Sequence, residues 1–297
     1  MPESESWTVG RLLTWTTDYL QRQGASSARL DAEVLLAEAL GCQRIQLYTA
    51  FHESVSEAAR SVFRGLVRRR AAGEPVAYLV GHREFYSLAF EVTPDVLIPR
   101  PETEHLVVES LELLKERPGS PPPQVLEVGT GSGAIAVAVA RHAPACRVTA
   151  VDISASALAV ARRNAHRHQV ADRIEFLQSD LLAALPAEPA FDLLVSNPPY
   201  VSGPEWDQLA REVREHEPEQ ALVGGPTGTE VIRRLVEQAD SRLAPGGWLL
   251  LEISPMILPV VRGILEEYAV YRNRRIVKDL AGLPRVLVAQ VSPAGES

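Results

Sequence analysis

Apolar residues recur at helical spacing through the first quarter of the chain. In RLDAEVLLAEAL the apolar residues form one stripe, which predicts an amphipathic helix that ends at Gly41. The same spacing predicts a second helix from about Ser56 to Ala72, and Gly73 ends it because glycine favours conformations outside the helix. We therefore expect residues from about 7 to 72 to be helical, within a small N-terminal domain over residues 1–76.

The pattern changes at REFYSLAFEVT, where polar and apolar residues alternate and aromatic side chains are frequent. This period of two predicts a β-hairpin, which we place in a linker over residues 77–100. VLIPRPETE then leads into a helix from about Thr103 to Glu116. The segment Arg117–Pro123, RPGSPPP, is a connector that its prolines stiffen.

From Gln124 onward short apolar runs alternate with helical segments, a pattern typical of an α/β domain with a parallel sheet covered on both faces. We expect this domain to occupy residues 101–297. The last two strand candidates, RIV and RVLVAQV, are joined only by a short turn and are expected to be antiparallel neighbours. The earlier predicted strands are VLEV, RVTAV, RIEFL, FDLLV and WLLLEI, and helices are expected to begin near Ala134, Ala155 and Thr229.

The composition is that of an ordinary soluble globular protein, with 46% hydrophobic and 23% charged residues among 297. No apolar run approaches the roughly 20 residues of a membrane span, and the acidic start MPESESWTVG is neither a secretory signal nor an Arg-rich transit peptide. Cys42 and Cys146 form no metal-type pair, so a reducing cytoplasm is the simplest setting, and the lack of a transit peptide favours a bacterial one. The net charge of −8 argues against broad non-specific binding to nucleic acid, which relies on many phosphate contacts.

The first candidate site is the glycine-rich loop in VLEVGTGSGAIAVAVA, between a predicted strand and a predicted helix. Gly129, Gly131 and Gly133 let the backbone turn tightly and approach a ligand, and the helix N-terminus presents free N–H groups. The loop also satisfies the relaxed G-x-G-x-x-A fingerprint of dinucleotide sites. The motif alone therefore indicates an adenosyl-type ligand, and a plain strand–helix turn is the alternative.

Two acidic residues are expected at the same edge of the sheet. Asp152 ends the run VTAVD and can accept hydrogen bonds from both ribose hydroxyls, or it caps the next helix, a role for which Ser154 competes. Asp180 follows the third strand in LQSD, where it can meet an adenine amino group or cap a loop.

A rigid turn, SNPPY (Ser196–Tyr200), follows the strand FDLLV. Pro198 and Pro199 fix φ and remove backbone donors, so nearby carbonyls keep no local partner. The strand would be the fourth of the sheet, which places the turn beside the glycine loop at the edge where α/β sheets bind ligands. The Asn197 side-chain oxygen and the Pro198 carbonyl can accept the two hydrogen bonds of an amide NH2, and Tyr200 can pack against its flat face.

This arrangement suits methyl transfer to a planar nitrogen, whose lone pair is delocalised. Holding that nitrogen in line with a sulfonium methyl supplies orientation, and acceptors aimed at its hydrogens stabilise the positive charge that develops. A nicotinamide enzyme has no use for such a turn, so we assign the glycine loop to S-adenosylmethionine. The alternative is a purely structural turn with a capping Asn197. It is less favoured, because SNPPY follows a glycine loop and Asp152 at suitable separations.

Together, EVGTGSGAIA, VDIS, SNPPY and the upstream GEPVAYLVGHREFYSLAFEVTPDVLIPRPETE resemble the peptide chain release factor N5-glutamine methyltransferases, the HemK/PrmC family. The likeness covers essentially the whole chain. LIPRPETE (Leu97–Glu104) is its narrower signature, because a sister family acting on a ribosomal large-subunit protein generally differs after IPR.

The resemblance implies a class I S-adenosylmethionine-dependent methyltransferase. Its fold would be Rossmann-like, with a mostly parallel seven-stranded sheet and an antiparallel last strand, a small N-terminal helical bundle that recognises the substrate, and a β-hairpin linker. The implied reaction moves a methyl group from S-adenosylmethionine to the side-chain amide nitrogen (N5) of the glutamine in the Gly-Gly-Gln motif of release factors, which modulates translation termination.

The resemblance also assigns residues by position. Asn197, Pro198 and Tyr200 would be catalytic, and with Pro199 they would hold the substrate glutamine. Phe85 and Arg100 lie in the linker region that faces this site in the family, and neither is assigned a catalytic role. The residues expected to bind the cofactor are Glu127, Gly129, Thr130, Gly131, Ser132, Gly133, Asp152, Ile153, Asp180, Leu181 and Asn197.

One departure from the family follows LLLEI. The family usually continues with a glycine and, a few residues later, a glutamine, whereas this chain continues with Ser254 and Pro255 in SPMILP. The departure bears on where the next helix begins and not on the chemistry, which lies at other strand ends.

Other function classes remain open. A ribosomal-protein glutamine methyltransferase, or a nucleic-acid methyltransferase acting on adenine N6 or guanine N2, can use a similar Asn-Pro-Pro-Tyr turn. The nucleic-acid enzyme must flip the base and needs a basic surface, which the acidic charge opposes. A non-catalytic module that senses the cofactor or binds a release factor is disfavoured because the glycine loop, Asp152 and SNPPY are intact.

The remaining charged clusters carry less chemistry. Arg60, Arg64 and Arg68 form a helical stripe, which is either a solvated face or a docking face for an acidic partner. His166 and His168 are two residues apart on a helix and face different ways, so no metal is expected. We expect a monomer whose partners are release factors, with no direct binding to nucleic acid or membrane.

Overall fold

The structure is a computed structural model that describes residues 7–115 and 121–293. The start MPESES and most of the connector expected at 117–123 lie outside the described residues. The chain forms two compact units. The first comprises the described residues up to Gly81 together with Ala210–His216, and the second comprises His82–Leu209 and the chain from Glu217 onward.

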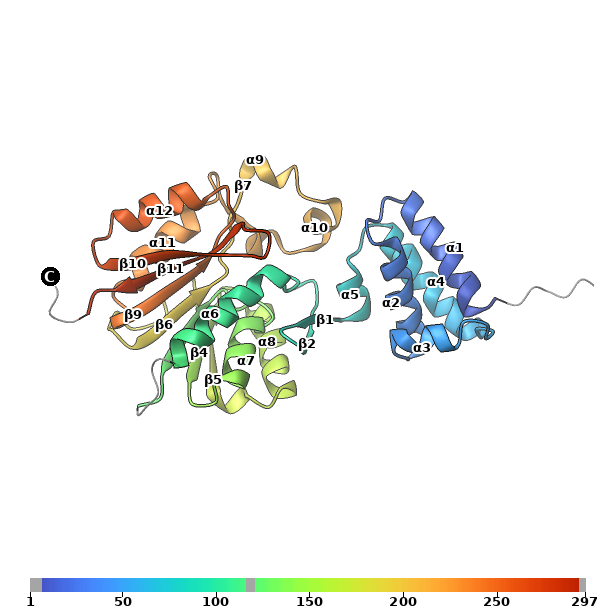
Figure 1. Cartoon of the computed structure of the whole chain (residues 1–297), viewed down its shortest axis with the longest axis horizontal. Helices are drawn as coiled ribbons and strands as arrows, with labels where there is room; N and C mark the ends of the chain where they lie inside the picture. The colour runs from blue at the N-terminus through green and yellow to red at the C-terminus, as the bar shows by residue number, and fades with distance from the viewer. Residues whose placement is uncertain (1–6, 116–120, 294–297) are drawn as a thin grey trace, which may run out of the picture. The chain divides into compact units, whose positions relative to one another are not determined.

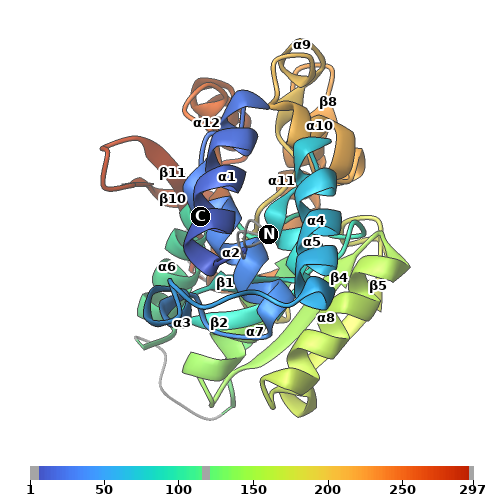
Figure 2. The same ribbon diagram turned by 90° about the vertical axis from the view of Figure 1, so that its right-hand side faces the viewer.

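The first unit is a helical bundle around an apolar core that includes Leu13, Leu35, Leu36 and Phe63 (Figure 1 and Figure 2). The two helices whose bounds the sequence predicts are present as α2 and α4, and Gly41 closes α2 in the left-handed conformation that glycine tolerates. Its helices are α1 (Val9–Arg22), α2 (Ala28–Leu40), α3 (Arg44–Thr49), α4 (Glu57–Ala71), α5 (Val76–Val80) and α10 (Arg211–His216).

Arg70 explains why the short helix α10 belongs to this unit. Its buried guanidinium contacts Asp31 of α2 at 2.7 Å and Glu212 of α10 at 2.6 Å. A buried cation needs such partners, because removing one leaves an uncompensated charge. The arginine at the end of α4 therefore joins a distant segment of the chain to the bundle.

The second unit is built on a seven-stranded sheet. Strands β3 to β6 and β9 run parallel, while β11 runs antiparallel to both of its neighbours, β9 and β10. In spatial order the strands are β10 (Tyr271–Lys278), β11 (Pro284–Val291), β9 (Leu243–Glu252), β6 (Phe191–Ser196), β3 (Gln124–Val128), β4 (Arg147–Asp152) and β5 (Ile174–Gln178). The predicted parallel α/β sheet, its Rossmann-like class and the antiparallel pairing of its last two strands are confirmed.

Helices cover both faces of this sheet (Figure 1). Helices α6 (Glu104–Lys115) and α7 (Ala134–His142) pack on one face, together with α8 (Ala155–Arg167), whose Ala165 joins the same core. Helices α11 (Glu230–Ala239) and α12 (Leu258–Glu266) pack on the other face. Because crossover helices link parallel strands, the carboxyl ends of β3 to β6 meet at one edge, and their loops lie together there.

Smaller elements complete the unit. The predicted hairpin is β1 (His82–Phe85) and β2 (Leu88–Glu91), and Phe85 and Phe90 anchor it in the core with their ring centroids 6.0 Å apart. The structure adds elements that the hydrophobic pattern does not predict. These are η1 (Pro101–Thr103), η2 (Ala171–Arg173), β7 (Val201–Ser202), α9 (Gly203–Trp206), η3 (Glu219–Ala221) and β8 (Val223–Gly225).

One strand boundary differs from the sequence prediction. Strand β9 begins at Leu243 and not near Trp248, and its register against β6 shifts between these two residues, where Gly246 has a positive φ of +74°. Helix α12 begins at Leu258, so SPMI forms a turn before it, and its N-cap residue Ile257 offers no side-chain hydrogen bond. Within residues 7–115 and 121–293, no helix is both long and apolar enough to cross a membrane.

Candidate active site

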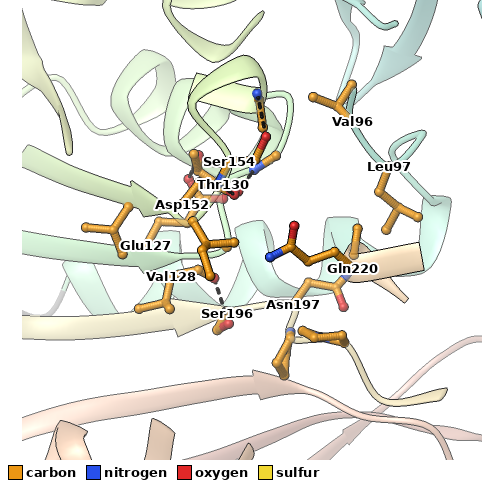
Figure 3. Close-up of a pocket in the computed structure, with 18 of the residues that line it drawn as sticks. Val96, Leu97, Glu127, Val128, Thr130, Asp152, Ser154, Ser196, Asn197 and Gln220 are labelled. Carbon is orange, nitrogen blue, oxygen red and sulfur yellow. Dashed lines mark hydrogen bonds between the residues drawn. The ribbon is translucent and has the colours of Figure 1, made fainter. Parts of the chain in front are cut away.

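A cavity of about 330 Å³ opens at the carboxyl edge of the sheet. Its wall combines the loops after β3, β4, β5 and β6 with Asp95–Arg100 and Pro218–Ala221 of the same unit. Figure 3 shows Asp152, Thr130 and Val128 on one side of the cavity, Leu97 and Gln220 on the other, and Asn197 between them. The glycine loop, the two acidic strand ends and the SNPPY turn, which the sequence singles out separately, therefore share one site.

The glycine loop needs the conformational freedom of its glycines. Gly129, Gly131 and Gly133 have φ of +74°, +54° and +79°, a region in which other residues are strained. A Cβ on Gly133 would approach Ala161 of α8 to 3.1 Å, whereas one on Gly131 would meet no atom within 4 Å. Gly133 is therefore needed for close packing against α8, whereas Gly131 leaves the backbone accessible beside the cavity.

The buried side chain of Glu127 supports this loop through two hydrogen bonds. Its side chain is 1% exposed, and Oε2 accepts hydrogen bonds from Thr130 Oγ1 at 2.5 Å and the Ala136 N–H at 3.1 Å. Burial raises the pKa of Glu127 to about 8, and the nearby charge of Asp152 adds to the rise, while the two hydrogen bonds oppose it. Near neutral pH this carboxyl is therefore mostly protonated.

Asn164 of α8 supports the same loop from the side. Its buried amide donates to the carbonyls of Ser132 at 2.9 Å and Glu91 at 3.0 Å, and its oxygen accepts the Glu91 N–H at 2.7 Å. The hairpin strand β2, helix α8 and the glycine loop are held together by this one side chain. Sequence reasoning missed Asn164, because an asparagine within a helix gives no signal of such distant partners.

Asp152 lies at the end of β4 and does not cap the following helix. Ser154 takes that role, since its Oγ accepts the Ala157 N–H at 3.1 Å. The two Asp152 oxygens accept the N–H groups of Gly131 at 2.8 Å and Ser154 at 2.9 Å. Burial raises the pKa of Asp152, and these N–H donors oppose the rise. The residue joins the glycine loop to the end of β4.

The loop after β5 supplies the far end of the cavity. Asp180 lies in the wall, and its carboxylate pairs with Arg234 of α11 at 2.8 Å. Leu181 adopts a positive φ of +49°, which turns the chain sharply after Asp180. Ile153, beside Asp152, leaves 45% of its surface exposed. Apolar surface from Ile153 and Leu181 thus accompanies the two acids.

The SNPPY turn is fixed from several sides. Ser196 Oγ donates to the Val128 carbonyl at 2.7 Å, which holds the turn against the end of β3. Asn197 Nδ2 donates to Thr103 Oγ1 at 3.2 Å, which leaves Oδ1 for another donor. Asn197, Pro198 and Pro199 lie in the cavity wall. The two predicted acceptors, the Asn197 oxygen and the Pro198 carbonyl, thus belong to adjacent residues of the wall.

The segment β8 packs tightly behind the turn. A Cβ on Gly224 would lie 2.4 Å from the Pro199 carbonyl oxygen, and one on Gly228 would lie 2.4 Å from the Tyr200 carbonyl oxygen. Only glycine permits this approach. Gly224 and Gly228 in ALVGGPTG are visible in the sequence, but the backbone that each of them meets becomes clear only from the fold.

Tyr200 lies behind the cavity wall. Its ring packs against the core that α11 and α12 cover. Burial, with a further contribution from the Glu252 charge, raises the pKa of Tyr200 well above its ordinary value. The predicted packing of Tyr200 against a substrate amide stays a prediction.

The opposite wall contains residues that sequence reasoning did not assign. Glu217 is buried, accepts the Ile98 N–H at 3.2 Å and pairs with Arg100. These contacts hold Asp95–Arg100 and Pro218–Ala221 together, so Leu97 and Gln220 come to face the glycine loop. Of the two linker residues that the family resemblance indicates, Arg100 lies in the wall, whereas Phe85 is buried in the core.

Two known domain families match parts of this chain. The PrmC N-terminal domain family matches residues 11–81, and the methyltransferase small domain family matches residues 106–225. The catalytic domain of hMettl16 has a TM-score of 0.56 at 15% identity, over 78% of this chain and 84% of that chain. A methyltransferase from Pyrococcus furiosus has a TM-score of 0.50 at 21% identity, over 77% and 98%. These two structures show the fold alone.

Sequence relatives are more specific. A release factor glutamine methyltransferase from Rhodopirellula baltica is 52% identical over 285 residues, which cover 96% of both proteins. Another from Koribacter versatilis is 43% identical over 272 residues, which cover 92% of this chain and 94% of the relative. The chain therefore belongs to the family of release factor glutamine methyltransferases.

Proposed function

We propose that this chain methylates the side-chain amide nitrogen (N5) of the glutamine in the Gly-Gly-Gln motif of peptide chain release factors. The relatives described above are named release factor glutamine methyltransferases. The observation that carries the proposal is the orientation of Asn197: its nitrogen is committed to Thr103, so its oxygen is left as an acceptor in the cavity wall. An acceptor at this position suits a substrate with an NH2 group.

S-adenosylmethionine is the cofactor, and it supplies an electrophilic methyl group on a sulfonium centre. The chain's residues fit it. The Asp152 carboxylate can accept hydrogen bonds from ribose hydroxyls, and the backbone at Gly131 is open beside it. Ile153 and Leu181 offer apolar surface for a purine, with Asp180 at its edge. The remaining residues assigned to cofactor binding are Gly129, Thr130, Ser132, Gly133 and Asn197, with Glu127 bracing the loop from below.

Asn197 and Pro198 supply the chemistry on the substrate side. An amide nitrogen is a poor nucleophile because its lone pair is delocalised into the carbonyl group. The Asn197 oxygen and the Pro198 carbonyl accept its two N–H groups, which orients the nitrogen and stabilises positive charge on it during attack. No base is needed before attack, and the extra proton leaves the nitrogen afterwards.

The turn owes its precision to its surroundings. Pro198 and Pro199 restrict the backbone, Ser196 fixes the turn to β3, and Gly224 lets β8 press against it. Because the two acceptors are already in place, they need little reorganisation when positive charge develops on the substrate nitrogen. Tyr200 completes the turn, and we assign it to packing against the substrate amide.

The first unit is assigned to recognition of the protein substrate. The match of residues 11–81 to the PrmC N-terminal domain supports this role. We further propose that the enzyme is a monomer that acts in the cytoplasm on release factors and binds neither nucleic acid nor membrane directly. Its domains would be residues 1–76 for recognition, 77–100 as linker and 101–297 for methyl transfer.

Methyl transfer from labelled S-adenosylmethionine tests the proposal. The acceptors are a bacterial release factor, its Gly-Gly-Ala variant, a ribosomal large-subunit protein and a mixture of DNA and RNA, each read by mass spectrometry. We expect label on the glutamine of the release factor alone. Label on the ribosomal protein or on nucleic acid, with the release factor untouched, would refute the substrate assignment. The assignment as a methyltransferase would still stand.

A further inference from the structure

Helix α11 holds the loop after β5 through two polar side chains that are four residues apart. Arg234 Nη2 donates to Asp180 Oδ2 at 2.8 Å, and Gln238 Oε1 accepts the Leu182 N–H at 3.0 Å. Residues four apart lie on one face of a helix, so both contacts come from the same face of α11. The loop is therefore attached to α11 at two neighbouring points.

The backbone of this loop is also fixed by contacts of its own. The Leu182 side chain is buried in the core that α11 and α12 cover, and the Ala184 N–H donates to Ser179 Oγ at 3.0 Å. These contacts do not involve Arg234. The distinct contribution of Arg234 is therefore its contact with the carboxylate of Asp180, and not the path of the chain.

The ion pair leaves one oxygen of Asp180 uncommitted. Oδ2 accepts from Arg234, whereas Oδ1 has no hydrogen-bond partner among the residues that the structure describes. Both side chains are half-exposed and lie in the wall of the cavity. A half-exposed aspartate without a partner can turn among its rotamers toward solvent. Arg234 thus holds the carboxylate in one orientation, with Oδ1 left for a ligand.

The purine of the cofactor is the ligand that the proposed function places at Asp180. Adenine carries an amino group, which donates hydrogen bonds, whereas hypoxanthine carries a carbonyl oxygen in its place, which only accepts them. A carboxylate oxygen also only accepts. A fixed Asp180 can therefore bind the amino group of adenine and disfavours the carbonyl group of hypoxanthine.

We propose that Arg234 is a positioning residue for the cofactor, which acts through Asp180 to make the site selective for the adenine amino group. The inference rests on the proposed function, because the placement of Asp180 at the edge of the purine comes from it. An acceptor that is oriented before the ligand arrives loses less rotamer freedom on binding. Arginine suits this task, since its guanidinium stays charged and donates along fixed directions.

Calorimetry of the full chain with two compounds tests the inference. S-adenosylhomocysteine carries adenine, and S-inosylhomocysteine is the same compound with hypoxanthine. We expect the wild type to prefer the adenine compound. Arg234→Ala should raise the Kd of that compound roughly threefold, the scale of a half-exposed ion pair, and should not raise the Kd of the other, so the preference narrows. In the Asp180→Ala background, Arg234→Ala should change neither Kd further.

Arg233→Ala is the matched control. Arg233 is the neighbouring residue on α11, is also half-exposed and pairs with Glu267 at 2.6 Å, but it lies outside the cavity wall. This change removes a similar ion pair from the same helix and should leave both Kd values as in the wild type. Partial unfolding weakens the apparent binding of both compounds equally, so the ratio of their Kd values remains a test for a less stable variant.

Several outcomes overturn the inference. One is a wild-type ratio of Kd values in Arg234→Ala, and another is an equal loss of preference in Arg233→Ala. An effect of Arg234→Ala that persists without Asp180 would exclude action through the carboxylate. A wild-type chain that binds neither compound refutes the cofactor site and the inference with it. Methylation of the release factor is measured separately by labelling, so a failure of the proposed function is distinguishable from a failure of this inference.

Discussion

Replacing Glu127 by glutamine is expected to remove a pH dependence from the stability of the second unit. The carboxyl has a pKa of about 8 in the folded chain, against 4.5 for an exposed glutamate. Below the lower value it is protonated in both states, and above the higher value it is ionised in both. Between them unfolding releases a proton, so the free energy of unfolding falls as the pH rises.

The size of this effect follows from the two pKa values. Each pH unit within the interval lowers the free energy of unfolding by about 1.4 kcal/mol, so raising the pH from about 5.5 to about 7.5 removes about 2.7 kcal/mol. Glutamine stays neutral at every pH and keeps one oxygen to accept from Thr130 Oγ1 or the Ala136 N–H. Groups common to both proteins cancel, so the stability of Glu127→Gln relative to the wild type should rise by that amount.

Urea unfolding at the two pH values, followed by tryptophan fluorescence, measures the difference. Trp248 packs against the core of the second unit and reports on it. The exposed Glu175→Gln on β5 is the matched control, and its stability relative to the wild type should be the same at both pH values. An equal difference at both pH values for Glu127→Gln would refute the reasoning, because it would mean that Glu127 is ionised in the folded chain.

Three further substitutions test the cavity. Asn197→Ala is expected to lower turnover by about 100-fold or more, the effect of losing one preorganised charge-stabilising group, with cofactor binding still detectable by calorimetry; near-normal turnover would exclude the acceptor role. Asp152→Ala should mainly raise the cofactor Kd. An unchanged Kd would mean that Asp152 does not bind the cofactor and only supports the glycine loop and the end of β4. Gly224→Ala places a Cβ 2.4 Å from the Pro199 carbonyl oxygen and should lower turnover by displacing the turn, whereas Gly203→Ala, where a Cβ meets no atom within 4 Å, should not.

The sequence predicts the assembly of the site because the fold class brings strand ends together. Alternating strands and helices imply a parallel sheet, and parallel strands of such a sheet end at one edge. Gly129, Asp152 and Asn197 each follow a predicted strand, so their meeting follows from topology alone. Their individual contacts confirm this placement and separate Ser154, the helix cap, from Asp152.

The sequence does not predict which residues support these strand ends. Thr103 and Asn197 are 94 residues apart, and no periodicity relates them. A strand pattern shows which face a residue occupies but not which side chain of another element it meets, so the contact between Asn197 and Thr103 cannot be read from it. The segment at Gly246 and Gly247 has the composition of a turn, and the register against β6 shifts there, so the sequence alone places the start of β9 too late.

The buried carboxyl of Glu127 shows how the wall of the cavity gains its direction. Glu127 is 1% exposed, and its Oε2 accepts hydrogen bonds from Thr130 Oγ1 and the Ala136 N–H at the base of the glycine loop. Thr130 lies in the wall of the cavity. Apolar packing alone would place this loop but would not set the direction of its hydrogen bonds. A buried acid does so, because its oxygen fixes where the Thr130 hydroxyl proton and the first N–H groups of α7 point.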